Sequence, residues 1–306
     1  MAAIKNNRLI QLAEMLPSGR VRLNEPLAPY TTFRIGGPAD ALVLPENGNE
    51  LQTVLRYCAD VGLSLFLLGR GSNLLIRDKG IRGVVVKLAG EFNRITVSGT
   101  AILAGAGAQL AETARVAQQH GLGGMEFAHG IPGSIGGATV MNAGAYNGEM
   151  KDIVTSVRVV DRQGVSQEMD RDAMAFGYRH SVLQGSDLIA IEVRLRLQPA
   201  DLAAVRAKMD NLAARRRAKQ PLDLPSAGST FRRPPGYYAG TLIEQTGLKG
   251  VRIGDAQVSE LHAGFIVNLG RATADDVMAL IKIVQEKVRE KFGVELETEL
   301  KVVGEA

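Results

Sequence analysis

The chain has 306 residues, 45% of them hydrophobic and 22% charged, which are the proportions of an ordinary globular protein with two or three domains. Its net charge of +4 comes without a long basic run and with only 5% aromatic residues, which argues against a nucleic-acid partner and favours a small anionic ligand. The single cysteine, Cys58, excludes a disulfide within the chain and a cysteine-rich zinc site, and no metal is expected. Because no apolar signal region and no run of about 18 apolar residues is present, we expect a soluble, cytoplasmic protein without membrane insertion.

The first third of the chain predicts helices that alternate with short strands. Residues 7–16 predict an amphipathic helix, and residues 30–37 predict a strand-like stretch that two glycines interrupt. From Asn49 to Gly62 apolar residues recur at helical spacing, and this pattern places Cys58 in the core. Further strands are expected over residues 65–68, 83–88, 95–97 and 101–104, and a helix is expected to run up to His120.

The middle of the chain predicts strands and one long helix. Residues 154–160 predict a strand, and Asp161-Arg-Gln-Gly164 resembles the turn of a hairpin. Strict alternation over residues 188–197 predicts another strand. A helix is expected over residues 202–219, with Val205, Met209 and Leu212 on its inner face.

A change of composition at Gln220-Pro-Leu-Asp-Leu-Pro225 predicts a linker, followed by a second unit. This unit is expected to contain a helix over residues 238–246 and a strand over residues 265–268. A long helix is expected to begin after Thr273, which has the chemistry of an N-cap. Its buried stripe would consist of Val277, Leu280, Ile281, Val284 and Val288. A last strand is expected over residues 294–303.

Two glycine segments partly match the dinucleotide-binding fingerprint of Rossmann folds. These are Gly69-Arg-Gly-Ser-Asn-Leu74 and Gly105-Ala-Gly-Ala-Gln-Leu110, and both carry leucine where the third glycine of that fingerprint belongs. The first segment also continues into Leu74-Leu-Ile76, which predicts a strand and no helix. The sequence therefore argues against a Rossmann domain.

Glycine also gathers further along the chain, at residues 121–124, in Gly130-Ile-Pro-Gly-Ser-Ile-Gly-Gly137 and in Asn142-Ala-Gly-Ala-Tyr146. Each segment taken alone is explained by tight turns. Together they favour a flat ligand that lies against the main chain, with backbone N–H groups directed at a pyrophosphate.

Three ordered motifs carry a specific resemblance: Tyr30-Thr-Thr-Phe-Arg-Ile-Gly-Gly37, Leu68-Gly-Arg-Gly-Ser-Asn-Leu74, and residues 130–137 with 142–146. From about Pro26 to Val303 the chain resembles the UDP-N-acetylenolpyruvoylglucosamine reductases (MurB) of peptidoglycan synthesis, in their shorter second class. The resemblance implies an α+β fold, with a two-subdomain FAD-binding domain of the vanillyl-alcohol-oxidase (PCMH) type and a smaller α+β substrate-binding domain. We expect the FAD-binding domain over residues 1–220, completed by 294–306, and the substrate-binding domain over residues 221–293.

The resemblance also implies an activity and three catalytic residues. Such an enzyme uses NADPH and bound FAD to reduce the enolpyruvyl ether of UDP-N-acetylglucosamine enolpyruvate to UDP-N-acetylmuramate. By their motifs, Arg179 would stabilise the substrate carboxylate, Ser229 would donate the proton, and Glu299 would assist Arg179. Without the resemblance, these would be a surface arginine, a turn serine and one of several glutamates on a solvated strand face.

The binding residues follow from the same resemblance. The expected FAD-binding residues are Arg34, Ile35, Gly69, Arg70, Gly71, Ser72, Asn73, Leu74, Gly130, Ile131, Pro132, Gly133, Ser134, Gly136, Gly137, Asn142 and Gly144. The expected substrate-binding residues are Tyr146, Arg215, Lys219, Arg233 and His262. Some relatives have asparagine where Arg233 stands. Arg215 and Lys219 lie one helical turn apart and are equally consistent with a solvated helix end.

Two other functions remain open at this point. One is a different FAD enzyme on the same domain type, such as an oxidase that attaches its flavin through histidine or cysteine; Cys58 lies outside the glycine segments, but His129 borders one. The other is a flavin-binding protein without catalysis, which would not need Arg179, Ser229 and Glu299 in three separate motifs. The sequence does not define an oligomeric state.

Overall fold

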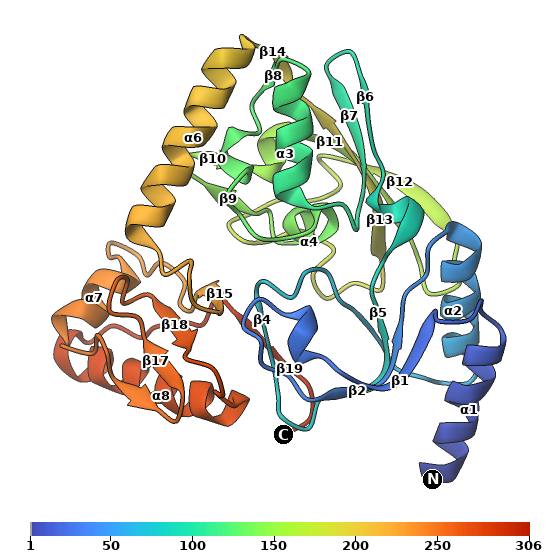
Figure 1. Ribbon diagram of the computed structural model, residues 1–306, viewed down its shortest axis with the longest axis horizontal. Helices are drawn as coiled ribbons and strands as arrows, with labels where there is room; N and C mark the ends of the chain where they lie inside the picture. Colours follow the sequence, from blue (N-terminus) through green and yellow to red (C-terminus); the bar gives the residue numbers. More distant parts are fainter. Residues whose placement is uncertain (1) are drawn as a thin grey trace. The chain divides into compact units, whose positions relative to one another are not determined.

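Apolar side chains form two separate cores, and the chain accordingly divides into two units. Figure 1 traces the helices and strands of both. The computed structural model describes residues 2–306. Unit 1 contains residues 1–23, 41–70 and 83–215, and unit 2 contains residues 24–40, 71–82 and 216–306. Each unit is therefore assembled from stretches that are distant in sequence. The predicted assignment of FAD and substrate binding to domains 1–220 and 221–293 stays a prediction.

An antiparallel five-stranded sheet is the centre of unit 1, in the order β12 (Ser166–Asp170), β11 (Val154–Val160), β13 (Ile189–Arg196), β7 (Ala101–Gly105) and β6 (Ile95–Ser98). Helix α4 (Ile135–Val140) contacts β13 and β7, and helix α3 (Leu110–Gln119) contacts β6. The alternation of apolar residues along β13 buries Val193 and Leu195 completely, as a strand with one face in the core requires.

A four-stranded sheet has the order β1 (Val21–Pro26), β2 (Pro38–Val43), β5 (Ile81–Val86) and β3 (Leu65–Leu67), with β3 and β5 parallel. Its first three strands each contain residues of both units. Helices α1 (Ala2–Glu14) and α2 (Gly48–Asp60) belong to unit 1. Helix α2 buries Leu51, Val54, Leu55 and Cys58, as its periodicity predicts.

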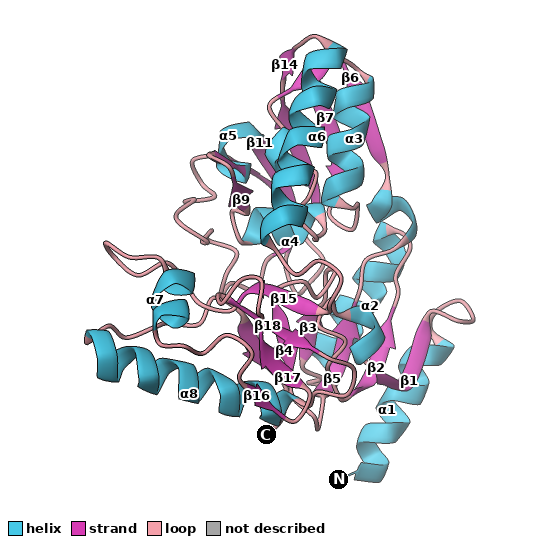
Figure 2. Ribbon diagram, turned by 60° about the vertical axis from the view of Figure 1, so that its left-hand side comes forward, coloured by secondary structure: helices cyan, strands magenta, loops and turns pink. Residues whose placement is uncertain are grey.

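Unit 2 contains a sheet in the order β15 (Ser226–Ser229), β18 (Phe265–Asn268), β17 (Ala256–Val258) and β16 (Arg252–Ile253). Helix α8 (Ala274–Phe292) packs on β17 and β16 and contacts α7 (Ala239–Gln245) (Figure 2). The last strand, β19 (Lys301–Val303), pairs in parallel with β4 (Leu74–Ile76).

The remaining elements are short, apart from one long helix. They are η1 (Ala28–Tyr30), η2 (Gly90–Asn93), β8 (Leu122–Gly123), η3 (Glu126–Ala128), β9 (Gly144–Ala145), β10 (Gly148–Glu149), α5 (Met150–Ile153), β14 (Gln198–Pro199) and α6 (Leu202–Lys219). Within residues 2–306, no helix combines the length and the hydrophobicity that a bilayer crossing needs.

The strongest periodic patterns are confirmed. Helix α8 buries all five residues of the predicted stripe, and its capping box joins Thr273 with Asp276. The turn after β11 closes through the N–H of Gly164 and the carbonyl of Asp161. In α6, Val205 and Met209 are buried, while Leu212 is half-buried.

Two strand predictions are wrong. Residues 30–37 form no strand, because η1 and a turn at Arg34 occupy them; Arg34 has a φ of +54°, which an extended strand does not allow. Of residues 294–303, only Lys301–Val303 are a strand. The preceding residues make one isolated bridge, between Phe231 and Thr298, although Leu296 and Leu300 are buried as the alternation predicts.

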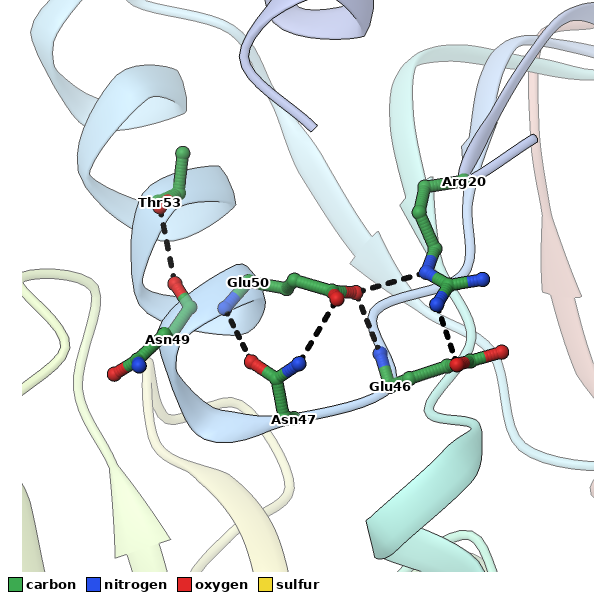
Figure 3. A network of polar contacts seen from close by, with 6 residues as sticks. All are labelled: Arg20, Glu46, Asn47, Asn49, Glu50 and Thr53. Atoms are coloured by element: carbon green, nitrogen blue, oxygen red, sulfur yellow. Dashed lines mark hydrogen bonds and ion pairs between the residues drawn. The ribbon is translucent and has the colours of Figure 1, made fainter. Parts of the chain in front are cut away.

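The N-terminus of α2 shows how a local sequence fixes a helix start (Figure 3). The side chain of Asn47 accepts a hydrogen bond from the N–H of Glu50, and the Glu50 carboxylate in turn accepts from Asn47 Nδ2, from the N–H of Glu46 and from Arg20 Nε. Burial acts to raise the pKa of Glu50, but the hydrogen bonds from Glu46 and Arg20 outweigh it, so the pKa lies below 4.5.

Glu50→Gln should lower the free energy of unfolding by about 1–2 kcal/mol, because it removes a charge-assisted cluster of hydrogen bonds. A carboxyl with a lowered pKa stabilises the fold above its unfolded pKa, and that stabilisation is lost as the pH falls through the folded pKa. The difference between wild type and Glu50→Gln in urea titrations should therefore be constant above about pH 5 and shrink below it. The control is Glu46→Gln, whose carboxylate is more exposed and should contribute less than about 0.5 kcal/mol. Equal effects of the two variants would contradict this interpretation.

Candidate functional site

The turn after β3 leaves a run of backbone donors without acceptors. No N–H group of residues 69–73 donates a hydrogen bond to any described part of the chain. Gly71 has a φ of +60°, and a side chain there would come within 2.6 Å of the Tyr30 carbonyl oxygen. A side chain at Gly69 would come within 2.8 Å of the Ser134 hydroxyl. The turn thus requires glycine at Gly71, where backbone lies in the way, whereas at Gly69 the Ser134 hydroxyl would have to move. The consecutive free N–H groups of the turn suit an anion.

Two cations of unit 1 lie at the start of this turn, at Gly69 and Arg70. Lys87 follows β5, and its Nζ donates to the carbonyl of Gly69 at 2.9 Å. Burial lowers the pKa of the Lys87 ammonium, and the positive charge of Arg70 lowers it further. Neither cation forms an ion pair with a carboxylate among the described residues. Like charges brought together without a counterion are unfavourable, so the arrangement fits a bound anion such as a pyrophosphate.

In the second glycine segment, residues 130–137, many of the backbone N–H groups already donate hydrogen bonds within unit 1. The N–H groups of Ile131, Ile135 and Gly136 donate to backbone carbonyls, and that of Gly137 donates to the Ser134 hydroxyl, which caps α4. In contrast, the N–H groups of Gly133 and Ser134 have no acceptor in the described chain. Few N–H groups of this segment, among them those of Gly133 and Ser134, therefore remain available for the predicted contacts with a pyrophosphate.

Several glycines of these motifs have packing reasons. A side chain at Gly136 would come within 2.8 Å of the Ala106 side chain, and one at Gly144 within 2.6 Å of the Gly148 carbonyl oxygen. Packing within the protein thus accounts for glycine at these two positions, and their predicted contact with FAD stays a prediction. Pro132 is exposed, and Leu74 begins strand β4.

The motif around residues 30–37 lies in unit 2. Arg34 is exposed on its left-handed turn, whereas the side chain of Ile35 is buried in the unit 2 core. Ile35 can therefore reach a ligand only through its backbone. The next residue, Gly36, has a φ of +150°, and a side chain there would come within 3.0 Å of Ile76.

Arg179 occupies a tight turn of unit 1. Its φ of +52° is unusual for a residue with a long side chain. Its guanidinium Nη2 donates to the carbonyl of Gly144 at 3.2 Å, and its Cζ lies 5.1 Å from the centre of the Tyr178 ring. Asn142, two residues before Gly144, is fully buried, and its side chain bonds to the protein on both its amide nitrogen and its oxygen.

Ser229 and Glu299 are brought to neighbouring segments of unit 2. The N–H of Glu299 donates to the carbonyl of Thr230 at 2.8 Å, directly after Ser229. Strand β15 is irregular between Ser226 and Ser229, where Gly228 has a φ of +78°. Because of this irregularity the Ser229 side chain is exposed, and its hydroxyl makes no hydrogen bond within the described residues. Glu299 is half-buried, and its carbonyl accepts from Asn73 Nδ2.

The predicted substrate-binding residues form several separate contacts. In unit 1, the Arg215 guanidinium lies 5.0 Å from the centre of the Tyr146 ring, and Tyr146 has a φ of +52°. Lys219 is exposed in the last turn of α6. In unit 2, the Arg233 guanidinium lies 4.1 Å from the centre of the Tyr238 ring.

His262 is the most enclosed of the predicted substrate-binding residues in unit 2. Its ring packs edge-on against Phe265, and its Nδ1 accepts from the N–H of Gly264 at 3.1 Å. Burial lowers its pKa. A side chain at Gly240 would come within 3.0 Å of this ring. These contacts favour a neutral ring with Nε2 as its remaining donor.

Comparisons with known proteins place these features in a family. Residues 39–170 match the FAD binding domain family, and residues 220–303 match the family described as UDP-N-acetylenolpyruvoylglucosamine reductase, C-terminal domain. The reductase of Caldanaerobacter subterraneus is 52% identical over 96% of this chain and 97% of its own length. That of Syntrophomonas wolfei is 48% identical over 96% and 99%. The chain belongs to the UDP-N-acetylenolpyruvoylglucosamine reductase family.

The fold agrees with this family. The crystal structure of UDP-N-acetylenolpyruvylglucosamine reductase (MurB) from Thermus caldophilus matches with a TM-score of 0.79 at 38% identity, over 92% of this chain and 97% of that one. Phl p 4.0202, a glucose dehydrogenase, has a TM-score of 0.50 at 11% identity, which concerns the fold alone. The predicted α+β, PCMH-type FAD-binding fold is confirmed.

The UDP-N-acetylenolpyruvoylglucosamine reductases are FAD-dependent oxidoreductases, and so is this chain. The sequence predicted FAD as bound cofactor and NADPH as reductant, and family membership supports both. The name of the family describes a UDP-sugar as the molecule that its members reduce. The rival interpretation as an oxidase that holds its flavin through cysteine also meets a structural objection: Cys58 is 3% exposed, and burial raises the pKa of its thiol to about 11.

Lys87 is a candidate cofactor residue that the motifs did not reveal. It lies in the sequence Val86-Lys-Leu88, in which a charged residue at a strand end attracts no notice. Lys87 directly follows β5, and its Nζ donates to the carbonyl of Gly69, 18 residues earlier. This bond places the ammonium at the start of the turn with the free N–H groups. Only the parallel pairing of β3 with β5 makes that proximity visible.

Lys87→Met should weaken FAD binding by tenfold or more, on the order of one charge-assisted hydrogen bond. Because the pKa of Lys87 is lowered, its ammonium in the free protein loses the proton at a lower pH than an ordinary lysine does, whereas a bound phosphate favours the charged form. FAD affinity should therefore fall as the pH rises through the lowered pKa in the wild type, and this dependence should be smaller in Lys87→Met. Fluorescence titration of apoprotein with FAD measures both. The exposed Lys79→Met is the matched control, and a Lys87→Met curve that coincides with it would refute the assignment.

Proposed function

We propose that the chain reduces the enolpyruvyl ether of UDP-N-acetylglucosamine enolpyruvate to the lactyl ether of UDP-N-acetylmuramate, with NADPH as the reductant, for peptidoglycan synthesis in the cytoplasm. The vinyl carbon distal to the carboxylate gains a hydride, and the carbon that bears the carboxylate gains a proton. When bound, FAD supplies that hydride after taking it from NADPH. The residues of the chain bind and orient the substrate, stabilise the charge that develops on it, and deliver the proton.

Arg179 receives the role of the fixed cation. Hydride addition moves negative charge into the substrate carboxylate, and a guanidinium holds such a group through two parallel hydrogen bonds without losing its own charge. Its restricted backbone and the bond to Gly144 support this role, because stabilisation of a transition state depends on groups that are already in place.

Ser229 receives the role of the proton donor. Its hydroxyl is exposed at the irregular end of β15 and has no partner among the described residues, so it is available to a substrate. Serine is a weak acid, and a donor at this position needs positive charge nearby to stabilise the alkoxide. Arg232 and Arg233, three and four residues further on, are the nearest cations in sequence.

Glu299 receives the role of assisting Arg179. Its backbone is held between Thr230 and Asn73, so the carboxylate starts from a fixed segment. The nucleotide end of the substrate is assigned to the cations Arg215, Lys219 and Arg233 with Tyr146 and His262. The exposed cation–π pair of Arg215 with Tyr146 supports a diphosphate or base contact.

Cofactor binding is assigned to the predicted FAD residues apart from Asn142, whose side chain bonds within the protein, and above all to the free N–H groups of residues 69–73 and of Gly133 and Ser134, to which Lys87 is added. The observation that carries the whole proposal is the family membership, at 52% identity over 96% of the chain.

Ser229→Ala separates proton donation from the other steps. Stopped-flow absorbance should show NADPH bleaching the bound flavin at the wild-type rate, because Ser229 has no part in that step. Recovery of the colour on addition of UDP-N-acetylglucosamine enolpyruvate should be slower by about 100- to 10,000-fold, the usual contribution of a positioned acid. The control is Ser226→Ala, at the other end of the same strand, which should behave as wild type in both steps. Equal slowing of both steps in Ser229→Ala would count against the proton-donor role.

A further inference from the structure

Arg179 is held in an unfavourable backbone conformation by its neighbours. A left-handed φ costs a residue with a side chain about 1–2 kcal/mol, so surrounding contacts have to maintain it. Gly177 and His180 close the turn with two reciprocal backbone hydrogen bonds, of 3.0 and 3.2 Å. The carbonyl of Arg179 itself accepts from Gln184 Nε2 at 2.8 Å.

Asn142 holds this turn from a second segment. Its side chain is fully buried, and Nδ2 donates at 2.9 Å both to the carbonyl of Gly177 and to the carboxylate of Glu149. Its Oδ1 accepts from the N–H of Lys151, also at 2.9 Å. Both donor hydrogens are therefore used within the protein, and a cofactor contact of this side chain would have to break one of these bonds.

The hairpin of β9 and β10, which follows Asn142, also contacts the charged end of Arg179. The guanidinium donates to Gly144, two residues after Asn142. The pKa of Glu149 lies below its ordinary value, first because Lys151 donates to the carboxylate, and Asn142 and the charge of Arg179 add to this effect. Residues 142–149 thus contact both the turn that contains Arg179 and the guanidinium of Arg179.

Gln184 joins the two segments a second time. Besides the Arg179 carbonyl, its Nε2 contacts the carbonyl of Val140 at 3.1 Å, and the hydroxyl of the buried Ser181 donates to that same carbonyl at 2.8 Å. Hydrogen bonds from Ser181 and Gln184 therefore connect the turn of Arg179 to Val140, two residues before Asn142.

We propose that Asn142, supported by Gln184, is a positioning residue that holds the guanidinium of Arg179 in the orientation in which it meets the substrate carboxylate. This inference rests on the proposed function of Arg179. It gives the Asn142 side chain a role other than the FAD binding that was predicted for this residue. A displaced guanidinium should slow the substrate-dependent step and leave the binding and the reduction of the cofactor intact, because a misplacement of about 1 Å can cost roughly 100-fold in rate.

A double-mutant cycle of Asn142→Ala with Arg179→Ala tests the proposal. Three quantities are measured for each variant: the Kd of apoprotein for FAD, the rate of flavin bleaching by NADPH, and the rate of flavin recovery with UDP-N-acetylglucosamine enolpyruvate. In the wild-type background, Asn142→Ala should slow recovery about 100-fold and change the FAD Kd and the bleaching rate less than threefold. In the Arg179→Ala background, it should change recovery less than threefold, because the residue through which it acts is gone.

Controls separate the possible failures. Asn47→Ala removes a hydrogen-bonding asparagine side chain elsewhere in unit 1, and should leave all three quantities unchanged. If Asn142→Ala does not fold, Gln184→Met takes its place in the cycle with the same expectation. Weaker FAD binding in both backgrounds, or an equal loss of recovery in both, overturns the positioning role. If Arg179→Ala itself recovers at the wild-type rate, the proposed function of Arg179 fails, and the positioning role fails with it.

Discussion

Peptide groups that the protein leaves without partners are the constraint on which this structure depends. Burying an N–H group without an acceptor costs free energy, and folded chains avoid it almost everywhere. The turn at residues 69–73 presents a run of N–H groups without an acceptor in the described chain, and the neighbouring cations Lys87 and Arg70 form no ion pair with a carboxylate among residues 2–306. A pyrophosphate would supply an acceptor for these N–H groups and a counter-charge for the two cations, and for this reason we assign the FAD pyrophosphate to this turn.

Glycine has two different purposes in this chain, and the structure separates them. At residues 69–73 it keeps side chains away from Ser134 and Tyr30 while the donors stay free. At Gly136 and Gly144 it permits close packing of protein on protein, and the nearby donors are already used. A count of glycines in the sequence does not distinguish these two uses. The sequence therefore predicted more N–H groups directed at a pyrophosphate over residues 130–137 than the structure leaves free.

Patterns that depend on neighbours along the chain were predictable. The helical stripe of α8, its cap at Thr273 and the hairpin turn at Gly164 depend on spacing and turn chemistry within a few residues. Predictions that required partners distant in sequence were less successful. The turn at Arg34 replaced a predicted strand, and the stretch before Lys301 remained extended but unpaired except at Thr298. Apolar alternation indicates which side chains are buried, but it does not reveal whether another strand is available for pairing.

The site residues show the same limit. The motifs of Arg179, Ser229 and Glu299 could be found only through a resemblance, because each is an ordinary surface residue by composition. The support of Arg179 by Asn142 and Gln184, and the place of Lys87 beside Gly69, come from pairings that no local pattern contains.

An anaerobic titration shows whether the chain reduces this substrate with its bound flavin. Purified protein reconstituted with FAD is bleached by one equivalent of NADPH, and UDP-N-acetylglucosamine enolpyruvate is then added while the visible flavin absorbance is followed. We expect the colour to return in proportion to the substrate added, with one UDP-N-acetylmuramate formed per flavin. Protein that takes up no FAD, or reduced flavin that this substrate leaves colourless, would contradict it.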